Sequence, residues 1–116
     1  MPGPDDMPDI SVDSTVLTLV NTFVVAPDRA DELMTVLVNA TDEVMQHIPG
    51  FISASLHMAT DRTRVVNYAQ WTSREAFNAM LQREDARQHM GQAAAIAERF
   101  DPVLCRAVHV VQNQVG

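Results

Sequence analysis

The chain has 116 residues, a mass of 12.8 kDa and a formal net charge of −7 at pH 7. This length suits one domain with a single core, and 47% hydrophobic against 20% charged residues excludes an intrinsically disordered chain. The acidic balance argues against a nucleic-acid partner, because nucleic-acid-binding proteins present a basic face to phosphates.

The N-terminus and the cysteine content indicate a compartment. Residues 1–6 have neither the basic start nor the apolar core of a signal peptide. No stretch approaches the roughly 20 apolar residues of a membrane helix, so we expect no membrane partner. The single cysteine, Cys105, cannot form an internal disulfide, which suits a reducing environment. We therefore expect a cytoplasmic protein.

The chain divides into one folded domain between two tails. Residues 1–13 are rich in Pro and Asp and predict a disordered acidic tail, and residues 113–116 form a short C-terminal tail. Residues 14–112 hold every periodic apolar segment and predict one domain.

The predicted elements alternate between strands and helices. Residues 15–25 are β-branched and apolar, as in a buried strand, and residues 29–47 repeat apolar side chains at helical spacing. Alternating residues predict strands over 51–58 and 64–71, joined by a turn at 60–63. A capping box at Thr72-x-x-Glu75 starts a short helix, and a second helix covers 86–100. Asp101-Pro102 is expected to break that helix before a last strand over 103–111.

This order predicts a ferredoxin-like βαββαβ fold of the α+β class, with a four-stranded antiparallel sheet and helices on one face. The first strand is apolar on both faces: Val16, Val20 and Val24 lie on one, and Leu17, Leu19 and Phe23 on the other. Because helices cover only one face, we expect a second subunit to cover the other. The expected assembly is a homodimer, a dimeric α+β barrel.

Polar side chains inside apolar strands are the candidates for chemistry. Asn21 interrupts the first strand, and Asn67 interrupts the run that ends in Trp71. Period-two alternation puts Asn67 and Trp71 on one face, where amide and indole N–H groups in an apolar pocket can stabilise an anion. The alternative is that Trp71 packs in the core and Asn67 satisfies loop backbone.

Whether His57 reaches the same pocket depends on the hairpin register. If residue 57 pairs with 67, His57 faces the pocket and is a candidate base; if 56 pairs with 67, it faces away. The remaining histidines are His47, His89 and His109, and His109 shares a face with Cys105 in the expected last strand. None has metal-ligand spacing, so no metal site is expected.

Several of these features together resemble a known family. Pro49–Phe51, His57, the strand Val65–Trp71, Ser73 and Phe77 are similar to the antibiotic biosynthesis monooxygenase family. The similarity covers about residues 14–112 and is greatest to the quinone-forming monooxygenases of aromatic polyketide pathways, of the actinorhodin type.

The resemblance implies a dimeric α+β barrel with one pocket per subunit between sheet and helices. It implies oxidation of an anthrone-type phenol to a quinone by O2, without metal, flavin or haem. Residue by residue, Asn67 and Trp71 match the family's pocket donors, Asn21 matches the first-strand asparagine of anthracycline-pathway members, and His57 matches a pocket histidine. The partner would be a small planar aromatic substrate.

The chain also departs from the actinorhodin-type pattern. Phe77 stands where those enzymes carry a tyrosine, and their pocket arginine has no aligned counterpart, although Arg87 is nearby in sequence. Methionines on the predicted helices suit an adaptable core and would also suit a flat aromatic ligand. We expect the substrate to contact a set of side chains on the predicted helices: Phe77, Met80, Arg87, His89 and Met90.

Two other functions fit the same fold. A haem-degrading oxygenase resembles this chain in a first-strand asparagine, Asn21, and in a third-helix histidine, His89, but has tryptophan where this chain has Met80. The other is a non-catalytic or stress-related barrel that binds a small ligand.

Overall fold

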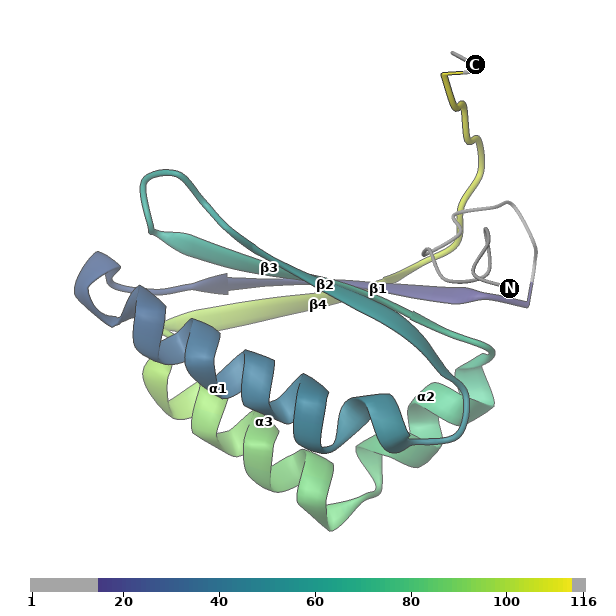
Figure 1. Cartoon of the computed structure of the whole chain (residues 1–116), viewed down its shortest axis with the longest axis horizontal. Helices are drawn as coiled ribbons and strands as arrows, with labels where there is room; N and C mark the ends of the chain where they lie inside the picture. The colour runs from purple at the N-terminus through teal and green to yellow at the C-terminus, as the bar shows by residue number, and fades with distance from the viewer. Residues whose placement is uncertain (1–14, 114–116) are drawn as a thin grey trace, which may run out of the picture.

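A computed structural model describes residues 15–113 (Figure 1). The predicted tail over 1–13 and residues 114–116 lie outside the described residues. The strands are β1 (Leu17–Val24), β2 (Phe51–Met58), β3 (Arg64–Trp71) and β4 (Arg99–Cys105). The helices are α1 (Ala30–Glu43), α2 (Arg74–Leu81) and α3 (Glu84–Ile96), and short 3-10 turns, η2 (Pro27–Arg29) and η3 (Met45–His47), flank α1.

The four strands form one sheet in the order β2-β3-β1-β4, and every neighbouring pair is antiparallel. Figure 1 shows α1, α2 and α3 on the same side of this sheet. The predicted ferredoxin-like α+β fold is therefore confirmed. Within the described residues, no helix combines the length and the apolar character needed to cross a bilayer.

The helix boundaries follow local capping and backbone geometry. The predicted helix over 29–47 is an α-helix only over 30–43, because the backbone of Val44 departs from helical geometry before the turn at Met45–His47. The N-cap of α2 is Ser73, one residue later than predicted, and its Oγ accepts a hydrogen bond from the Ala76 N–H at 3.1 Å. This cap fixes where α2 begins above the sheet.

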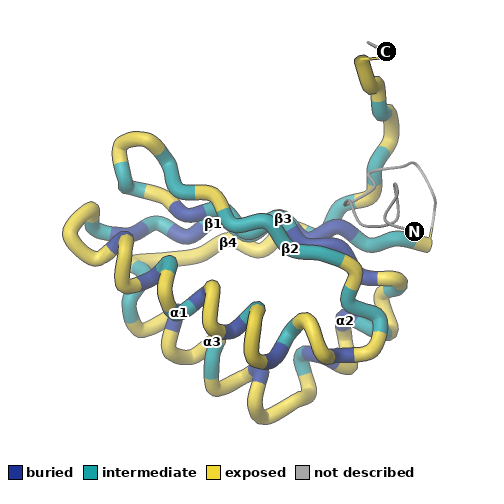
Figure 2. Tube along the Cα trace, in the orientation of Figure 1, coloured by how far each residue is buried: buried dark blue, intermediate teal, exposed yellow. Residues whose placement is uncertain are grey.

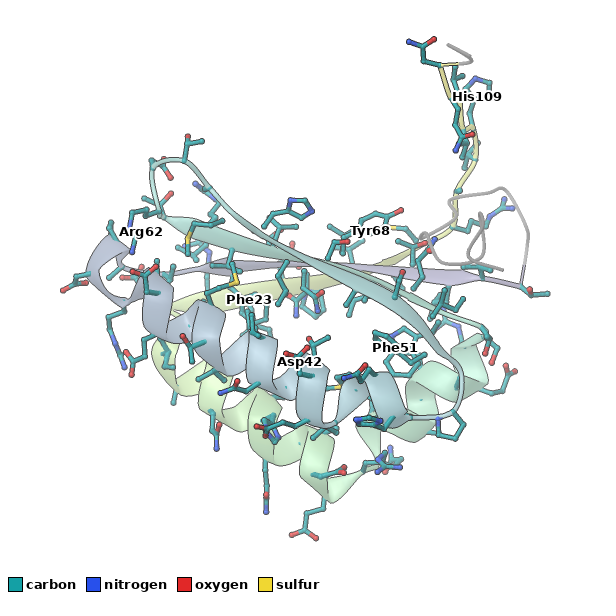
Figure 3. The ribbon with its side chains drawn as sticks, in the orientation of Figure 1. Phe23, Asp42, Phe51, Arg62, Tyr68 and His109 are labelled. Carbon is teal, nitrogen blue, oxygen red and sulfur yellow. The ribbon has the colours of Figure 1, made fainter. Side chains whose placement is uncertain are left out.

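The prediction of the last strand over 103–111 is wrong. α3 ends at Ile96, and the Glu98 N–H donates to the Val24 carbonyl at 2.8 Å, so the β4 ladder starts directly after the helix. Pro102 lies inside β4, opposite Asn21. An edge strand forms ladder hydrogen bonds on one side only, so it tolerates a proline. His109 consequently lies beyond the strand, on an extended segment that leaves the body of the fold (Figure 3).

The hairpin between β2 and β3 decides which way its side chains face. The Ala59 N–H donates to the Arg64 carbonyl at 2.9 Å, and the Asp61 carboxylate accepts from the Thr63 N–H at 3.0 Å and from its hydroxyl at 2.6 Å. These two hydrogen bonds hold the pKa of Asp61 below its usual range. The resulting register pairs residue 56 with 67 and 57 with 66.

A bulge at the start of β2 breaks the predicted alternation. Phe51 pairs with Trp71 but Ser53 pairs with Gln70, so Ile52 is the extra residue. The bulge turns Phe51 to the helix side of the sheet, whereas strict alternation would have placed it with Ser53. In Figure 3, Phe51 and Phe23 lie between sheet and helices, while Tyr68 lies on the other side.

The apolar core is split into two clusters along the inner face of the sheet. Figure 2 shows buried positions recurring along the helices, with exposed positions between them. The first cluster comprises Leu19, Val44, Ile48, Ala69, Trp71, Phe77, Met80 and Ala86. The second comprises Phe23, Val25, Ala30, Leu33, Leu37, Val65 and Ala93. On both central strands, an asparagine separates the residues of the two clusters.

Candidate active site

A cavity of about 340 Å³ occupies the gap between the two core clusters, with the sheet on one side and the helices on the other. Its volume lies in the range typical of small-molecule sites. Small side chains on the sheet and the helices leave the space open: Ala40, Ala54, Ala69 and Ala93 all line it. The lining is almost entirely apolar, so the few polar groups in it determine the chemistry.

Asn21 and Asn67 are directly opposite each other on β1 and β3, at the centre of the cavity's sheet wall. Both are partly buried, and the Oδ1 atoms of both are buried without a hydrogen-bond partner. A buried amide oxygen without a hydrogen-bond partner costs about 1–3 kcal/mol of folding free energy. A ligand that donates a hydrogen bond to either Oδ1 would therefore bind favourably here. The amide pair offers both donors and acceptors to a ligand with phenol and carbonyl oxygens.

Trp71 completes the polar part of the sheet wall, two pleats from Asn67 on β3. Its side chain is 2% exposed and lies edge-on to Phe51 and Phe77, with ring centroids 5.4 Å and 6.2 Å away. These two contacts fix the indole plane. Trp71 therefore gives the cavity a rigid aromatic wall, and its indole carries one N–H donor.

Two large apolar residues of the cavity wall also reach the surface, one on α3 and one on the edge strand β4. Met90 on α3 and Phe100 on β4 both line the cavity, and they are 40% and 49% exposed. Large apolar side chains that are part wall and part surface mark an entrance for an apolar ligand. Phe100 also lies against Phe23, with ring centroids 5.9 Å apart, which links the entrance to the second core cluster.

The structure places three of the predicted catalytic residues, Asn21, Asn67 and Trp71, around one cavity. Four of the predicted substrate contacts line the helix side of the same cavity: Phe77, Met80, His89 and Met90.

Two predicted site residues do not line the cavity. His57 pairs with Val66, on the opposite face of the sheet from Asn67, and it is exposed. The placement of His57 in the pocket is therefore corrected: the hairpin register turns it away. Arg87 is an exposed residue of α3, two positions from His89, and it points to a different side of the helix from the cavity wall.

Several lining residues escaped the sequence analysis. Phe51 was missed because a bulge is not visible in residue alternation, and Phe100 because it was assigned to the end of a helix. Thr41, on α1, was missed because the polar, exposed Asp42 and Glu43 follow it in the sequence; its hydroxyl donates to the Leu37 carbonyl at 2.9 Å, so it is already paired. Gln70 has an unpartnered buried Oε1, but its side chain belongs to the other face of the sheet.

Within residues 15–113, no group of three or more His, Cys, Asp or Glu side chains is arranged to hold a metal ion. Among the described lining residues, His89 is the one ionisable side chain.

Comparison with known proteins identifies the family. Residues 16–101 match the antibiotic biosynthesis monooxygenase family. The tetracenomycin-F1 monooxygenase of Streptomyces glaucescens is 39% identical over 103 residues, which is 89% of this chain and 91% of that protein.

Solved structures share the fold. SnoaB, a cofactor-independent oxygenase of Streptomyces nogalater, superposes with a TM-score of 0.78 at 24% identity, over 86% of this chain and all of that one. A monooxygenase from the gene ActVA-Orf6 of Streptomyces coelicolor, solved with nanaomycin D, superposes with a TM-score of 0.73 at 27% identity, over 86% and 94% of the two chains. The chain therefore belongs to the antibiotic biosynthesis monooxygenase family and is an enzyme of that family.

Proposed function

We propose that the protein is a cofactor-independent monooxygenase that uses O2 to oxidise an anthrone-type ring of an aromatic polyketide to a quinone. The observation that carries this proposal is the pair Asn21 and Asn67, which face each other beside Trp71 in an apolar cavity and whose Oδ1 atoms are buried without a partner. The family and the similarity to the tetracenomycin-F1 monooxygenase support it.

The reaction needs little from the protein beyond binding and charge stabilisation. An anthrone methylene loses a proton, and the electron pair delocalises over the phenol and carbonyl oxygens. The anion adds O2 at that carbon, and the peroxide anion takes up the proton that was removed. The hydroperoxide so formed loses water to leave a new carbonyl. One oxygen atom ends in the quinone and the other in water, so no external reductant is consumed.

The cavity residues have separate roles in this reaction. Amide and indole N–H groups donate to the oxygens on which negative charge develops, and donors in an apolar site act more strongly than they would in water. Phe51, Phe77 and Trp71 hold a flat ring system between aromatic walls. Exclusion of water protects the anion from reprotonation before O2 reacts with it.

The test is oxygen uptake with dithranol, a hydroxylated anthrone, measured against heat-denatured protein because dithranol oxidises slowly by itself. We expect enzyme-dependent uptake of one O2 per quinone, and with 18O2 one labelled atom in the product. Dithranol that binds without oxygen uptake above background would reject the oxygenase proposal and favour a ligand-binding barrel.

Chelation tests the absence of a metal from the mechanism. Because amides and an indole can stabilise the anion unaided, we expect activity to survive exhaustive dialysis against EDTA, measured by the same oxygen uptake. A rate that falls on chelation and returns with added iron or zinc would contradict the proposal.

We also infer that the functional unit is a homodimer formed through the open face of the sheet. All the helices of the described chain lie on the other face, and the open face carries Val20, Val66, Tyr68 and Val103. Val103 is 46% exposed. Face-to-face packing of two such sheets buries these side chains and closes a barrel.

A further inference from the structure

We propose that His89 is the catalytic base, the group that takes the proton from the substrate, and that the Glu43 carboxylate stabilises its protonated form. This inference rests on the proposed function, because it names the proton acceptor that the oxygenation requires. Neither the family match nor the relatives assign a base to this chain.

The first argument is composition. Among the described residues that line the cavity, His89 is the one whose side chain can accept a proton as a base. Asn21, Asn67 and Trp71 stabilise an anion but cannot accept a proton to create it. His57 lies on the other face of the sheet, and position 77 is a phenylalanine, which has no acid–base group.

The second argument is the tautomer. Nδ1 of His89 lies 3.0 Å from the backbone carbonyl oxygen of Asp85, one turn earlier on α3. A carbonyl oxygen only accepts, so Nδ1 carries the hydrogen in the neutral ring and Nε2 is left with its lone pair. The helix thus fixes which nitrogen is the acceptor.

The third argument is what surrounds that nitrogen. Nε2 lies 3.7 Å from a carboxylate oxygen of Glu43 on α1, too far for a hydrogen bond but close enough to stabilise an imidazolium. The Asp85 carboxylate on α3 already forms a salt bridge with Arg83, at 3.0 Å. Among the described residues of α2 and the sheet, no charged side chain lines the cavity. The imidazole is 20% exposed, so it meets both the cavity and the solvent.

The proposed step is a single proton transfer. The substrate's acidic C–H or O–H bond breaks, its proton passes to Nε2, and the electron pair stays on the substrate as the anion held by the amides. The imidazolium returns the proton to the peroxide anion that forms when O2 adds, and the resulting hydroperoxide then loses water.

The kinetic test compares His89→Gln with His47→Gln, an exposed histidine of η3 that does not line the cavity. We expect kcat with dithranol to fall about 100-fold in His89→Gln and to stay unchanged in His47→Gln, since a positioned base contributes about 10²- to 10⁴-fold. KM should change less than kcat, because a neutral polar side chain still fills the wall. Equal kcat in both variants would overturn the assignment.

Two further measurements separate a base from a structural residue. The acid limb of the pH dependence of kcat/KM should be present in the parent enzyme and absent from His89→Gln. In His89→Ala, added imidazole should restore part of the lost kcat, since it can occupy the vacated space and accept the proton. An unchanged acid limb together with no rescue would reject the base. Glu43→Gln should lower kcat about two- to fivefold, the scale of an exposed ion pair.

A probe that is not turned over distinguishes this inference from the proposed function. The visible absorption of 2-hydroxyanthraquinone shifts to longer wavelength when its phenol ionises. At a pH where the free probe is neutral, we expect the parent protein to bind it in the ionised form and His89→Gln to bind it in the neutral form. If the parent enzyme does not oxidise dithranol but this difference is present, the proposed function fails and the base stands. If dithranol is oxidised and both proteins bind the same form, the base fails.

Discussion

At the scale of single residues, the asparagine pair determines what the cavity can do. Asn21 and Asn67 lie between the two core clusters on β1 and β3, at positions where apolar side chains would join the clusters into one core. Their Oδ1 atoms are buried and unpaired, so the pair costs folding free energy. Retaining such a cost at the centre of a core is typical of a binding site and is unnecessary for the fold.

Substitution of the donors should therefore separate activity from stability. We expect Asn67→Ala and Trp71→Phe each to lower kcat with dithranol about 100-fold, the scale of losing one donor to a developing oxyanion. The Tm of Asn67→Ala should be equal to or higher than that of the parent, because a buried unpaired amide is removed.

The matched control is Asn39→Ala, which removes an exposed amide of α1 outside the cavity. It should leave the rate unchanged. Rates in Asn67→Ala and Trp71→Phe equal to that of Asn39→Ala would remove the donor role.

At the scale of elements, Gly50 fixes how α2 meets the sheet. Gly50 has φ +92°, and a Cβ there would overlap the Cβ of Ala76 on α2 and approach Oγ1 of Thr72 at 2.9 Å. The Gly50 carbonyl accepts from the Thr72 N–H at 2.8 Å, which ties the start of β2 to the start of α2. The close approach places Phe77 and Met80 over the cavity.

We expect Gly50→Ala to lower the free energy of unfolding by about 2 kcal/mol or more, since it adds both overlap and positive-φ strain. Gly91→Ala is the matched control, because a Cβ on that α3 glycine meets nothing within 4 Å. It should be neutral or raise stability by about 0.5–1 kcal/mol, as expected for a helix interior. Urea denaturation of both variants checks this, and equal stabilities would refute the close-packing argument.

At the scale of the whole molecule, the structure has one covered and one open sheet face (Figure 1). The covered face holds the cavity, and the open face carries apolar side chains that a monomer would leave in contact with water. The proposed dimer would bury the apolar side chains of the open face.

Sedimentation velocity at micromolar concentration should show a dimer for the parent protein. Val103 lies on β4, on the open face of the sheet, and we expect Val103→Glu to weaken the dimer by placing a charge in the interface. Val38→Glu changes an exposed residue of α1 and should leave the dimer intact. A monomeric parent, or a dimer indifferent to Val103→Glu, would contradict the proposed interface.

Much of the fold could be predicted from the sequence alone. β2 and β3 have the bounds that period-two alternation predicts, and the ferredoxin-like order follows from which periodicity each segment shows. The resemblance to antibiotic biosynthesis monooxygenases is also visible in the sequence, because it rests on motif residues such as those of the strand Val65–Trp71. Strand alternation separately places Asn67 and Trp71 on one face. These are local properties, set by side-chain chemistry and backbone period.

Only the tertiary structure decided the features that depend on register and on edges. The hairpin turn sent His57 to the open face, and the bulge at Ile52 brought Phe51 into the cavity, because a shift of one residue reverses which face a strand residue occupies. β4 could include Asp101 and Pro102 because it lies at the sheet edge, a position that no local pattern reveals. The pairing of Asn21 with Asn67, and of His89 with Glu43, joins residues far apart in the chain, so it arises only when the strands and helices pack together.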